Sequence, residues 1–278
     1  MYKVVELFGI STTQQDADWK TIIKEQKCIF TEKKCYKVRK SDPDTAIGTC
    51  TVLYGKEKRP TIICPNRLLQ NRKVFMDCIH LLQLHQPGND LHVVSEISVP
   101  GGSIDYVIAS INKGKAVDFI GIEFQTLDTT GTVWPERQRF LKDQGFRVSE
   151  PSSDKSYGMN WKMTAKTILV QLHHKVDTFE HLRKHLVLII QDHFFDYMKK
   201  EFNFDSVNNP ALIGDSLHIH SYSVIGKESL SLRLKDRLST DSEGIAKCLG
   251  LNAEAKVELS SILHAIEQKI SSATLLRI

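Results

Sequence analysis

The segment from Leu91 to Leu127 constrains the fold more than any other part of this sequence. It contains three apolar runs, LHVVSEISV, IDYVIASI and KAVDFIGIEFQTL, separated by the turn sequences PGGS and NKGK. Short runs rich in β-branched residues and bounded by glycine-containing turns are typical of β-strands. We therefore expect three consecutive strands, the first two forming an antiparallel hairpin.

The flanking segments predict helices and further strands. Before the hairpin, NRLLQNRKVFMDCIHLLQLHQ places its apolar residues on one helical face and ends at PGND. After it we expect a short helix in WPERQRFLKDQ, one helix or a broken pair in MNWKMTAKTILVQLHHKVDTFEHLR, and a strand HLVLII leading into the helix QDHFFDYMKKEF. The C-terminal part offers two strands, LHIHSYSVI and SLSLRLKDRL, and an amphipathic helix from about Asn252 to Ile270, which we expect to pack on its own sheet. This order predicts an α/β fold with a mixed sheet flanked by helices.

Composition narrows the class of protein only slightly. The chain has 278 residues, of which 41% are hydrophobic, enough for a substantial core. Its net charge of +4 is compatible with a nucleic-acid partner without requiring one. The first residues lack the pattern of a secretory signal, and no apolar run approaches the roughly 18 residues of a membrane span. We expect an intracellular, cytoplasmic protein with no membrane partner.

Two carboxylates and an amide mark the hairpin and the third strand as a candidate site. Glu123 and Gln125 are two residues apart in one strand and face the same way, whereas Phe124 faces the opposite way. The hairpin brings Asp105 alongside, so that the two carboxylates and the Phe124 carbonyl form a hard oxygen site for Mg²⁺. The alternative is that these side chains are solvated. An otherwise apolar strand, however, has little reason to carry Glu123 and Gln125 on one face unless they meet a ligand.

These residues carry a family resemblance. IDYVI followed by IEFQT resembles the PD-(D/E)XK nuclease core, with Gln125 in place of the usual lysine, which gives an E-x-Q motif. The same departure occurs in the NotI-like type II restriction endonucleases, which also carry an N-terminal four-cysteine iron-binding module, and the run ICPNRL strengthens the likeness. The resemblance covers roughly residues 25 to 175. It implies a PD-(D/E)XK restriction-endonuclease-like core in a prokaryotic protein, cleaving double-stranded DNA with Asp105 and Glu123 as metal ligands.

The absence of the motif lysine raises the question of which group supplies a positive charge. Lys162 and Lys166 are spaced i, i+4 on a predicted helix and so share a face that can approach the scissile phosphate. A solvated helix face is the alternative for both. Glu96, just before the hairpin turn, is a candidate third carboxylate, with an exposed or capping role as its alternative.

Four of the six cysteines cluster near the N-terminus. Cys28, Cys35, Cys50 and Cys64 are separated by 6, 14 and 13 residues in a segment with many turns and few apolar residues. Four thiolates suit tetrahedral zinc or iron, and such a site would stabilise this segment. Independent buried cysteines are the alternative. We therefore expect a metal-binding module at residues 1–65 and a nuclease domain with a C-terminal extension at residues 66–278.

The function indicated is that of a type II restriction endonuclease. A repair or transposon-associated nuclease of the same fold remains an alternative, as does a catalytically silent DNA-binding protein. Silent members of nuclease folds usually lose a carboxylate, and this chain has both Asp105 and Glu123. Because a duplex has two strands of opposite polarity, we expect a homodimer, or a heterodimer with a sister subunit.

Overall fold

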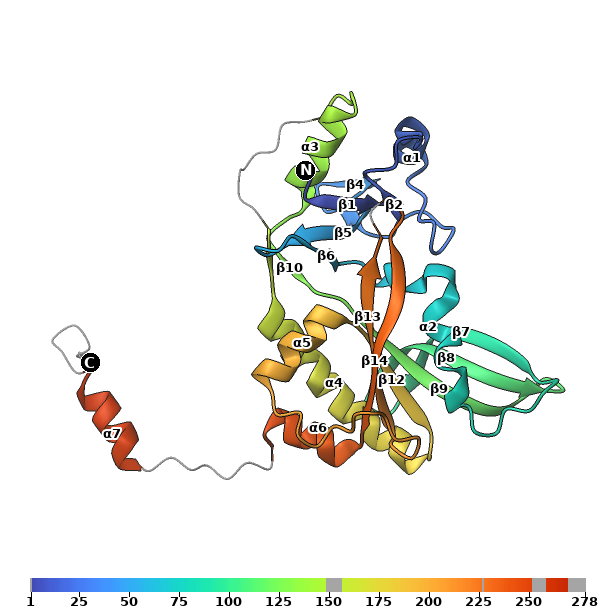
Figure 1. Ribbon diagram of the computed structural model, residues 1–278, viewed down its shortest axis with the longest axis vertical. Helices are drawn as coiled ribbons and strands as arrows, with labels where there is room; N and C mark the ends of the chain where they lie inside the picture. The colour runs from blue at the N-terminus through green and yellow to red at the C-terminus, as the bar shows by residue number, and fades with distance from the viewer. Residues whose placement is uncertain (1, 149–156, 227, 252–258, 270–278) are drawn as a thin grey trace.

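The computed structural model describes residues 2–148, 157–226, 228–251 and 259–269 of the chain (Figure 1). A six-stranded mixed sheet lies at its centre, with the spatial order β14-β13-β12-β9-β8-β7. β12 is parallel to both of its neighbours, β9 and β13, and the other pairs are antiparallel. The strands are β7 (Asp90–Val99), β8 (Gly102–Asn112), β9 (Lys115–Gln125), β12 (His185–Gln191), β13 (Leu217–Ile225) and β14 (Ser231–Thr240). The mixed sheet and the three consecutive strands predicted from the sequence are both confirmed.

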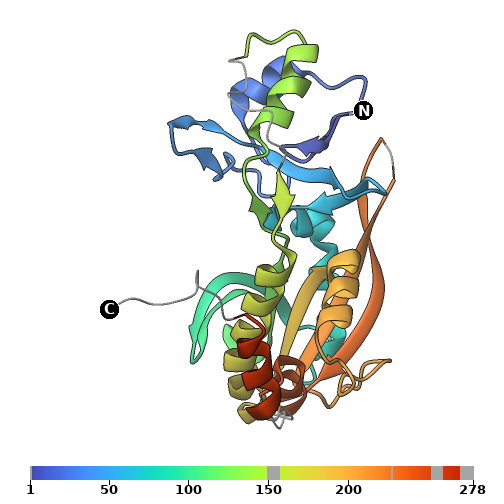
Figure 2. The same cartoon turned by 90° about the vertical axis from the view of Figure 1, so that its left-hand side faces the viewer.

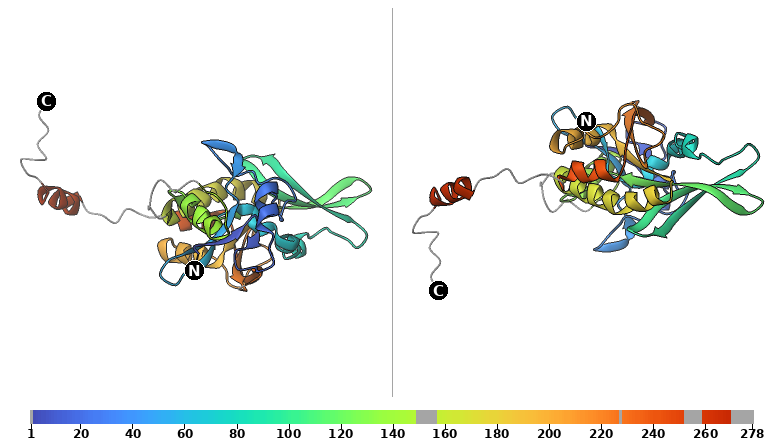
Figure 3. Two further views of the ribbon diagram at one scale, coloured as in Figure 1. Left: turned by 90° about the horizontal axis from the view of Figure 1, so that it is seen from above. Right: turned by 90° about the horizontal axis from the view of Figure 1, so that it is seen from below.

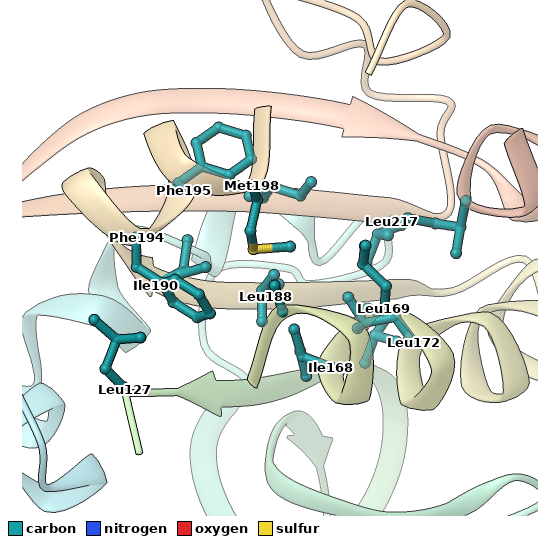
Figure 4. Close-up of a cluster of buried hydrophobic side chains, with 14 of the residues drawn as sticks. Leu127, Ile168, Leu169, Leu172, Leu188, Ile190, Phe194, Phe195, Met198 and Leu217 are labelled. Carbon is teal, nitrogen blue, oxygen red and sulfur yellow. The ribbon is translucent and has the colours of Figure 1, made fainter. Parts of the chain in front are cut away.

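Helices cover the sheet on both faces, and β12 is therefore buried throughout. Leu188 and Ile190 face one core, formed with α4 (Trp161–His181), α5 (Asp192–Glu201) and α6 (Ser242–Leu249). Figure 4 shows these two residues packed among side chains of α4 and α5. Val187 and Ile189 face a second core under η1 (Pro65–Arg72), α2 (Lys73–Met76) and η2 (Ile79–Leu81). α4 is a single helix, which settles the choice between one helix and a broken pair.

The N-terminal residues form a smaller sheet of their own, with the order β2-β1-β5-β6. Figure 2 shows this part above the large sheet. Its elements are β1 (Val4–Leu7), β2 (Ile10–Ser11), α1 (Trp19–Glu25), the β3 (Val38–Arg39) and β4 (Asp42–Ala46) hairpin, β5 (Thr49–Tyr54) and β6 (Arg59–Ile62). α3 (Trp134–Asp143) supplies Phe140 to the same core, where its ring meets that of Trp19 at 4.9 Å. β10 (Thr129–Thr130) precedes α3 and β11 (Gly158–Met159) comes between α3 and α4, and the two pair as a two-stranded antiparallel ribbon.

The single helix predicted before the hairpin is wrong. The chain breaks at Asn71 and Arg72, which both have a φ of +53°, and forms the short elements η1, α2 and η2 instead. The side chain of Gln70 explains the break, because it accepts a hydrogen bond from the backbone N–H of Leu232 and donates one to the carbonyl of Leu230. These contacts with a distant hairpin outweigh the local helical pattern.

A buried ion pair ties the N-terminal sheet to the large one. Arg67 in η1 is fully buried and donates to Glu6 of β1 at 2.7 Å, and its guanidinium also donates to the carbonyl of Leu230 at 3.0 Å. Thr51 of β5 donates to Glu6 as well. Breaking such a pair leaves a buried charge unpaired, at a cost of about 3–5 kcal/mol. The two parts are therefore held together by a polar network as well as by apolar packing.

The C-terminal helix differs from its expected packing. α7 (Leu259–Glu267) has no buried residue, and its apolar side chains are exposed. The expectation that it packs on its own sheet is therefore wrong for the helical residues 259–267, and residues 252–258 and 270 of the predicted helix lie outside the described residues. Figure 3 shows α7 apart from the sheet in both views. Within the part of the chain that the structure describes, no helix has the length and apolar character needed to cross a membrane.

Candidate active site

Asp105 and Glu123 lie side by side where the β8–β9 ladder ends. The two strands pair from Asn112 and Lys115 as far as Tyr106 and Ile122. Beyond that point a side chain acts as the acceptor in place of a backbone carbonyl: Oδ2 of Asp105 accepts a hydrogen bond from the Phe124 N–H at 2.8 Å. Glu123 is buried, with 4% of its surface exposed. The structure thus brings together the two carboxylates that the sequence singled out.

Because successive side chains of a strand point to opposite faces, the Phe124 side chain points away from those of Glu123 and Gln125. The Phe124 ring packs in the second core, 5.0 Å from the ring of Tyr106 and 6.0 Å from that of Phe75. Gln125 lines the same pocket as Glu123 and donates from Nε2 to the carbonyl of Thr126 at 2.7 Å. Gln125 is therefore placed beside the carboxylates, as an amide that is itself held in position.

A lysine that the sequence analysis missed completes the cluster. Lys175 of α4 is buried, and its Nζ donates to Oε1 of Glu123 at 2.8 Å and to the carbonyl of Ser103 at 2.6 Å. The signal was present in the sequence, because Lys175 follows Ile168 and Leu172 at spacings of seven and three on the apolar face of α4. A charged residue at a core position of an amphipathic helix indicates a buried partner.

Two glycines let α4 approach the strands closely enough for this contact. A Cβ on Gly121 of β9 would lie 2.4 Å from the ring of Phe179 on α4. A Cβ on Gly101, in the β7–β8 turn, would lie 2.4 Å from the carbonyl of His174. Gly101 also has a φ of +92°, which favours glycine. The PGGS turn and the strand that carries Glu123 are thus shaped to receive the helix that carries Lys175.

The other predicted helpers lie elsewhere. Lys162 and Lys166 are both exposed on α4, and neither lines the pocket of Asp105 and Glu123. Both lie on the solvated helix face, which was the alternative for them, because the helix turns its apolar stripe and Lys175 toward the sheet. Glu96 is exposed on β7, beside Asp105 in register, since its neighbours Ser95 and Ile97 pair with residues on either side of Asp105. It is not one of the residues that line the pocket.

Burial controls the acidity of both carboxyls. It raises the pKa of Glu123 to about 7, against the opposing hydrogen bond from Lys175. It also raises the pKa of Asp105, which the Phe124 N–H and Lys175 oppose and the charge of Glu96 reinforces. Carboxyls with raised pKa values are characteristic of functional sites, because ionising them at neutral pH calls for a nearby cation.

The pocket itself is small and polar, with a volume of about 310 Å³. Its lining residues are Gly101, Gly102, Ser103, Asp105, Glu123, Phe124, Gln125, Ile168, Gln171 and Lys175. Two carboxylates are oxygen donors of the kind that Mg²⁺ accepts, with water filling its other positions. Among the described residues, no group of three or more His, Cys, Asp or Glu side chains has a metal-site arrangement. The donor set therefore fits a cation held by two carboxylates rather than by a complete protein cage.

The four N-terminal cysteines lie near one another. Cys28, Cys50 and Cys64 are buried, Cys35 is partly buried, and the thiols interact electrostatically with one another. A hydrogen bond from Cys50 lowers the pKa of Cys64 to about 6, assisted by the charge of Lys37 and by backbone N–H groups at the start of η1. A stabilised thiolate among three further thiols fits a soft metal ion chemically, although the group is not arranged as a metal site. Cys78 and Cys248 are buried apart from this cluster.

Comparison with known proteins identifies a family for this chain. A family model described as restriction endonuclease NotI matches residues 17–214. The chain is also similar to a solved structure described as Pyrococcus furiosus SfsA in complex with Ca²⁺, with 12% identity and a TM-score of 0.33 over 71% of this chain and 73% of that one. No curated protein sequence matches. The family match spans both the four cysteines and the pocket of Asp105 and Glu123.

Proposed function

Because the chain belongs to the NotI restriction endonuclease family, we propose that it is a type II enzyme of the cytoplasm that hydrolyses phosphodiester bonds of double-stranded DNA at a specific sequence, with Mg²⁺. The observation that carries this proposal is the convergence of Asp105, Glu123 and Lys175 in one pocket. Two carboxylates and a lysine are the working parts of a PD-(D/E)XK core, which we propose for the large sheet and its helices.

Asp105, Glu123 and the Phe124 carbonyl are the groups that would hold Mg²⁺. Held by these groups, Mg²⁺ would supply Lewis acidity toward water and a counter-charge for the phosphate. Asp105 is already oriented for this role, because its Oδ2 is fixed by the Phe124 N–H. Glu123 has a raised pKa because of burial, so ionised Glu123 gains from a cation beside it.

We propose that Lys175 supplies the positive charge that the usual motif lysine would provide, because Gln125 occupies the position of that lysine. It reaches Glu123 from α4 rather than from β9, and the carbonyl of Ser103 fixes its Nζ. A buried ammonium next to the metal-binding carboxylate supplies a fixed positive charge for a phosphate oxygen. Gln125 then serves to orient a water or a phosphate oxygen through its amide.

The cysteine cluster is proposed to hold one structural zinc or iron ion. Support comes from the proximity of Cys28, Cys35, Cys50 and Cys64 and from the stabilised thiolate of Cys64. Such an ion would tie the α1 region to β5 and to the start of η1, where these cysteines lie.

The test of the function is cleavage of phage DNA by the purified protein in the presence of Mg²⁺. Discrete fragments with a common end sequence support a type II restriction endonuclease. A smear, or cleavage of branched substrates alone, would favour the repair or transposon-associated nuclease. Intact DNA that nevertheless shifts on a gel would favour the silent DNA-binding protein. Glu123→Ala, purified in the same way, is the matched control: loss of cleavage in this variant assigns the activity to the pocket of Asp105 and Glu123, whereas cleavage at the wild-type rate counts against that site.

A further inference from the structure

A second and larger cavity lies apart from the pocket of Asp105 and Glu123. Its volume is about 820 Å³, and it shares no lining residue with that pocket. It is lined by the β5–β6 turn, the start of α4 and α5, elements that Figure 1 labels. Its lining residues are Tyr54, Gly55, Lys56, Glu57, Arg59, Thr61, Trp161, His193, Asp196, Tyr197, Lys199 and Lys200. We call it the aromatic-basic pocket.

Aromatic rings form one side of the aromatic-basic pocket. The ring of Trp161 lies 5.4 Å from that of Tyr197, 5.7 Å from that of His193 and 6.1 Å from that of Tyr54. Trp161, Tyr54 and Tyr197 are partly buried and pack on the edge of the main core, so each keeps some surface in the cavity. Partly exposed aromatic rings at a cavity wall provide π-faces on which a nucleobase stacks.

Unpaired positive charge lies beside the rings. Arg59 is bonded to Glu57 and Lys199 to Asp196, at 2.6 Å and 2.8 Å. The acidic residues of the lining are thus already matched by cations. Lys56 and Lys200 make no ion pair with any other residue that the structure describes, and both are exposed. They are available to bind phosphate.

The position of the aromatic-basic pocket relates it to the proposed cleavage site. Trp161 begins α4, and Gln171 of the same helix lines the pocket of Glu123. Ten residues of helix span about 15 Å. A strand advances about 3.4 Å for each nucleotide, so this separation corresponds to four or five nucleotides.

We propose that the aromatic-basic pocket binds an unstacked nucleotide of a DNA strand, with its base against Trp161 and its phosphate on Lys56 and Lys200. The proposal rests on the proposed DNA substrate and adds to it a contact that lies about four or five nucleotides from the scissile bond. A free mononucleotide has the same chemistry, and the test separates the two sources.

The probe is a fluorescently labelled oligodeoxythymidylate of eight nucleotides, whose anisotropy is measured with the full chain in EDTA so that no cleavage occurs. We expect Trp161→Ala to weaken binding about tenfold, in line with base stacking on an aromatic side chain, and Trp161→Phe to bind nearly as well as the wild type. The double variant Lys56→Ala/Lys200→Ala should also bind more weakly and show a smaller salt dependence. Lys166→Ala is the matched control, since Lys166 is exposed on α4 outside the aromatic-basic pocket.

Competition with thymidine monophosphate identifies the source of the nucleotide. Displacement only by oligonucleotides supports a strand contact, whereas equal displacement by the monophosphate overturns it in favour of a free nucleotide. Wild-type protein that does not bind the probe, or Trp161→Ala protein that binds it normally, overturns the aromatic-basic pocket. Cleavage of phage DNA by the wild type is scored separately, so a pocket that fails while cleavage persists is distinguished from a failed nuclease assignment.

Discussion

Lys175 Nζ lies 2.8 Å from Oε1 of Glu123, and the two side chains are only 7% and 5% exposed. The pair joins the middle of α4 to the end of β9 across the site that we propose for Mg²⁺. In the absence of a metal ion, the ammonium is the counter-charge that compensates for burying the carboxylate. Binding of Mg²⁺ would supply a second cation to the same carboxylate and leave Lys175 with hydrogen-bonding capacity for a phosphate oxygen.

We predict that Glu123→Ala abolishes cleavage and leaves sequence-specific DNA binding largely intact. One of the two carboxylates proposed to bind Mg²⁺ is removed, whereas groups that contact bases are untouched. Binding should even tighten slightly, because a negative charge near the phosphates is lost. A gel shift combined with a cleavage time course measures both effects, and cleavage at the wild-type rate would disprove the site.

Lys175→Met should lower the cleavage rate by about 10²-fold or more, as expected for the loss of one fixed charge at the reacting phosphate. Lys166→Met, on the exposed face of the same helix, should cleave as the wild type does. Thermal unfolding of both variants checks that the loss is not one of folding. Retention of activity in Lys175→Met, with loss in Lys166→Met, would restore the role first expected of Lys166.

The contrast between these two lysines shows what the sequence was able to predict. That the side chains of Glu123 and Gln125 point to the same face follows from the two-residue repeat of a β-strand, which can be predicted without knowing the tertiary structure. The choice of lysine depended on which face of α4 meets the sheet. Spacing alone favoured the pair Lys162 and Lys166, whereas the interrupted apolar stripe at Lys175 carried the decisive information.

Tertiary contacts explain the larger errors in the predicted fold. The segment after Cys64 has a helical pattern, but hydrogen bonds from Gln70 to the β13–β14 hairpin break it. The N-terminal sheet was not expected, because its strands are short and its core is completed by Phe140 from α3, far along the chain. Neither contact leaves a local signal in the sequence.

The pH dependence follows from the raised pKa of Glu123. Its folded-state pKa is about 7, above the value of about 4.5 for a free side chain, so protonation favours the folded state. This contribution to stability is present in full below the unfolded pKa and is lost as pH rises through about 7. We therefore expect metal-free wild-type protein to lose stability relative to Glu123→Gln between pH 4.5 and pH 7.

Thermal unfolding of both proteins in EDTA across this range checks the expectation. The difference between them removes the contributions of the other titrating groups. If Mg²⁺ binds the ionised carboxylate, as we propose, its affinity for the wild type should rise as pH rises through about 7. A difference that is flat with pH would show that Glu123 is already ionised in the folded protein at low pH.

The cysteine cluster predicts about one zinc or iron ion per chain, bound independently of added Mg²⁺. Cys50→Ser should lose this metal and make the N-terminal segment sensitive to protease, while the large sheet stays folded. Elemental analysis and limited proteolysis measure the two effects. The matched control is Cys248→Ser, which removes a buried thiol outside the cluster and should retain the metal. Metal-free wild-type protein that is folded and active would rule out the metal site.

The last prediction concerns assembly, because one chain offers one proposed cleavage site, the pocket of Asp105 and Glu123, whereas a duplex has two strands. A double-strand cut in one encounter requires two sites related by a two-fold axis, and we propose that a second copy of this chain supplies the other.

The exposed apolar side chains of α7 follow the spacing i, i+3, i+4 and i+7 and are the proposed contact with that copy, namely Leu259, Ile262, Leu263 and Ile266. Ile262→Glu/Leu263→Glu should therefore leave the fold intact and convert a sedimenting dimer into a monomer that nicks plasmid DNA instead of linearising it. Leu212→Glu, at a similarly exposed apolar residue, should remain dimeric. A homodimer also requires a palindromic recognition sequence that is cut symmetrically, so mapped ends without two-fold symmetry would indicate a heterodimer with a sister subunit instead.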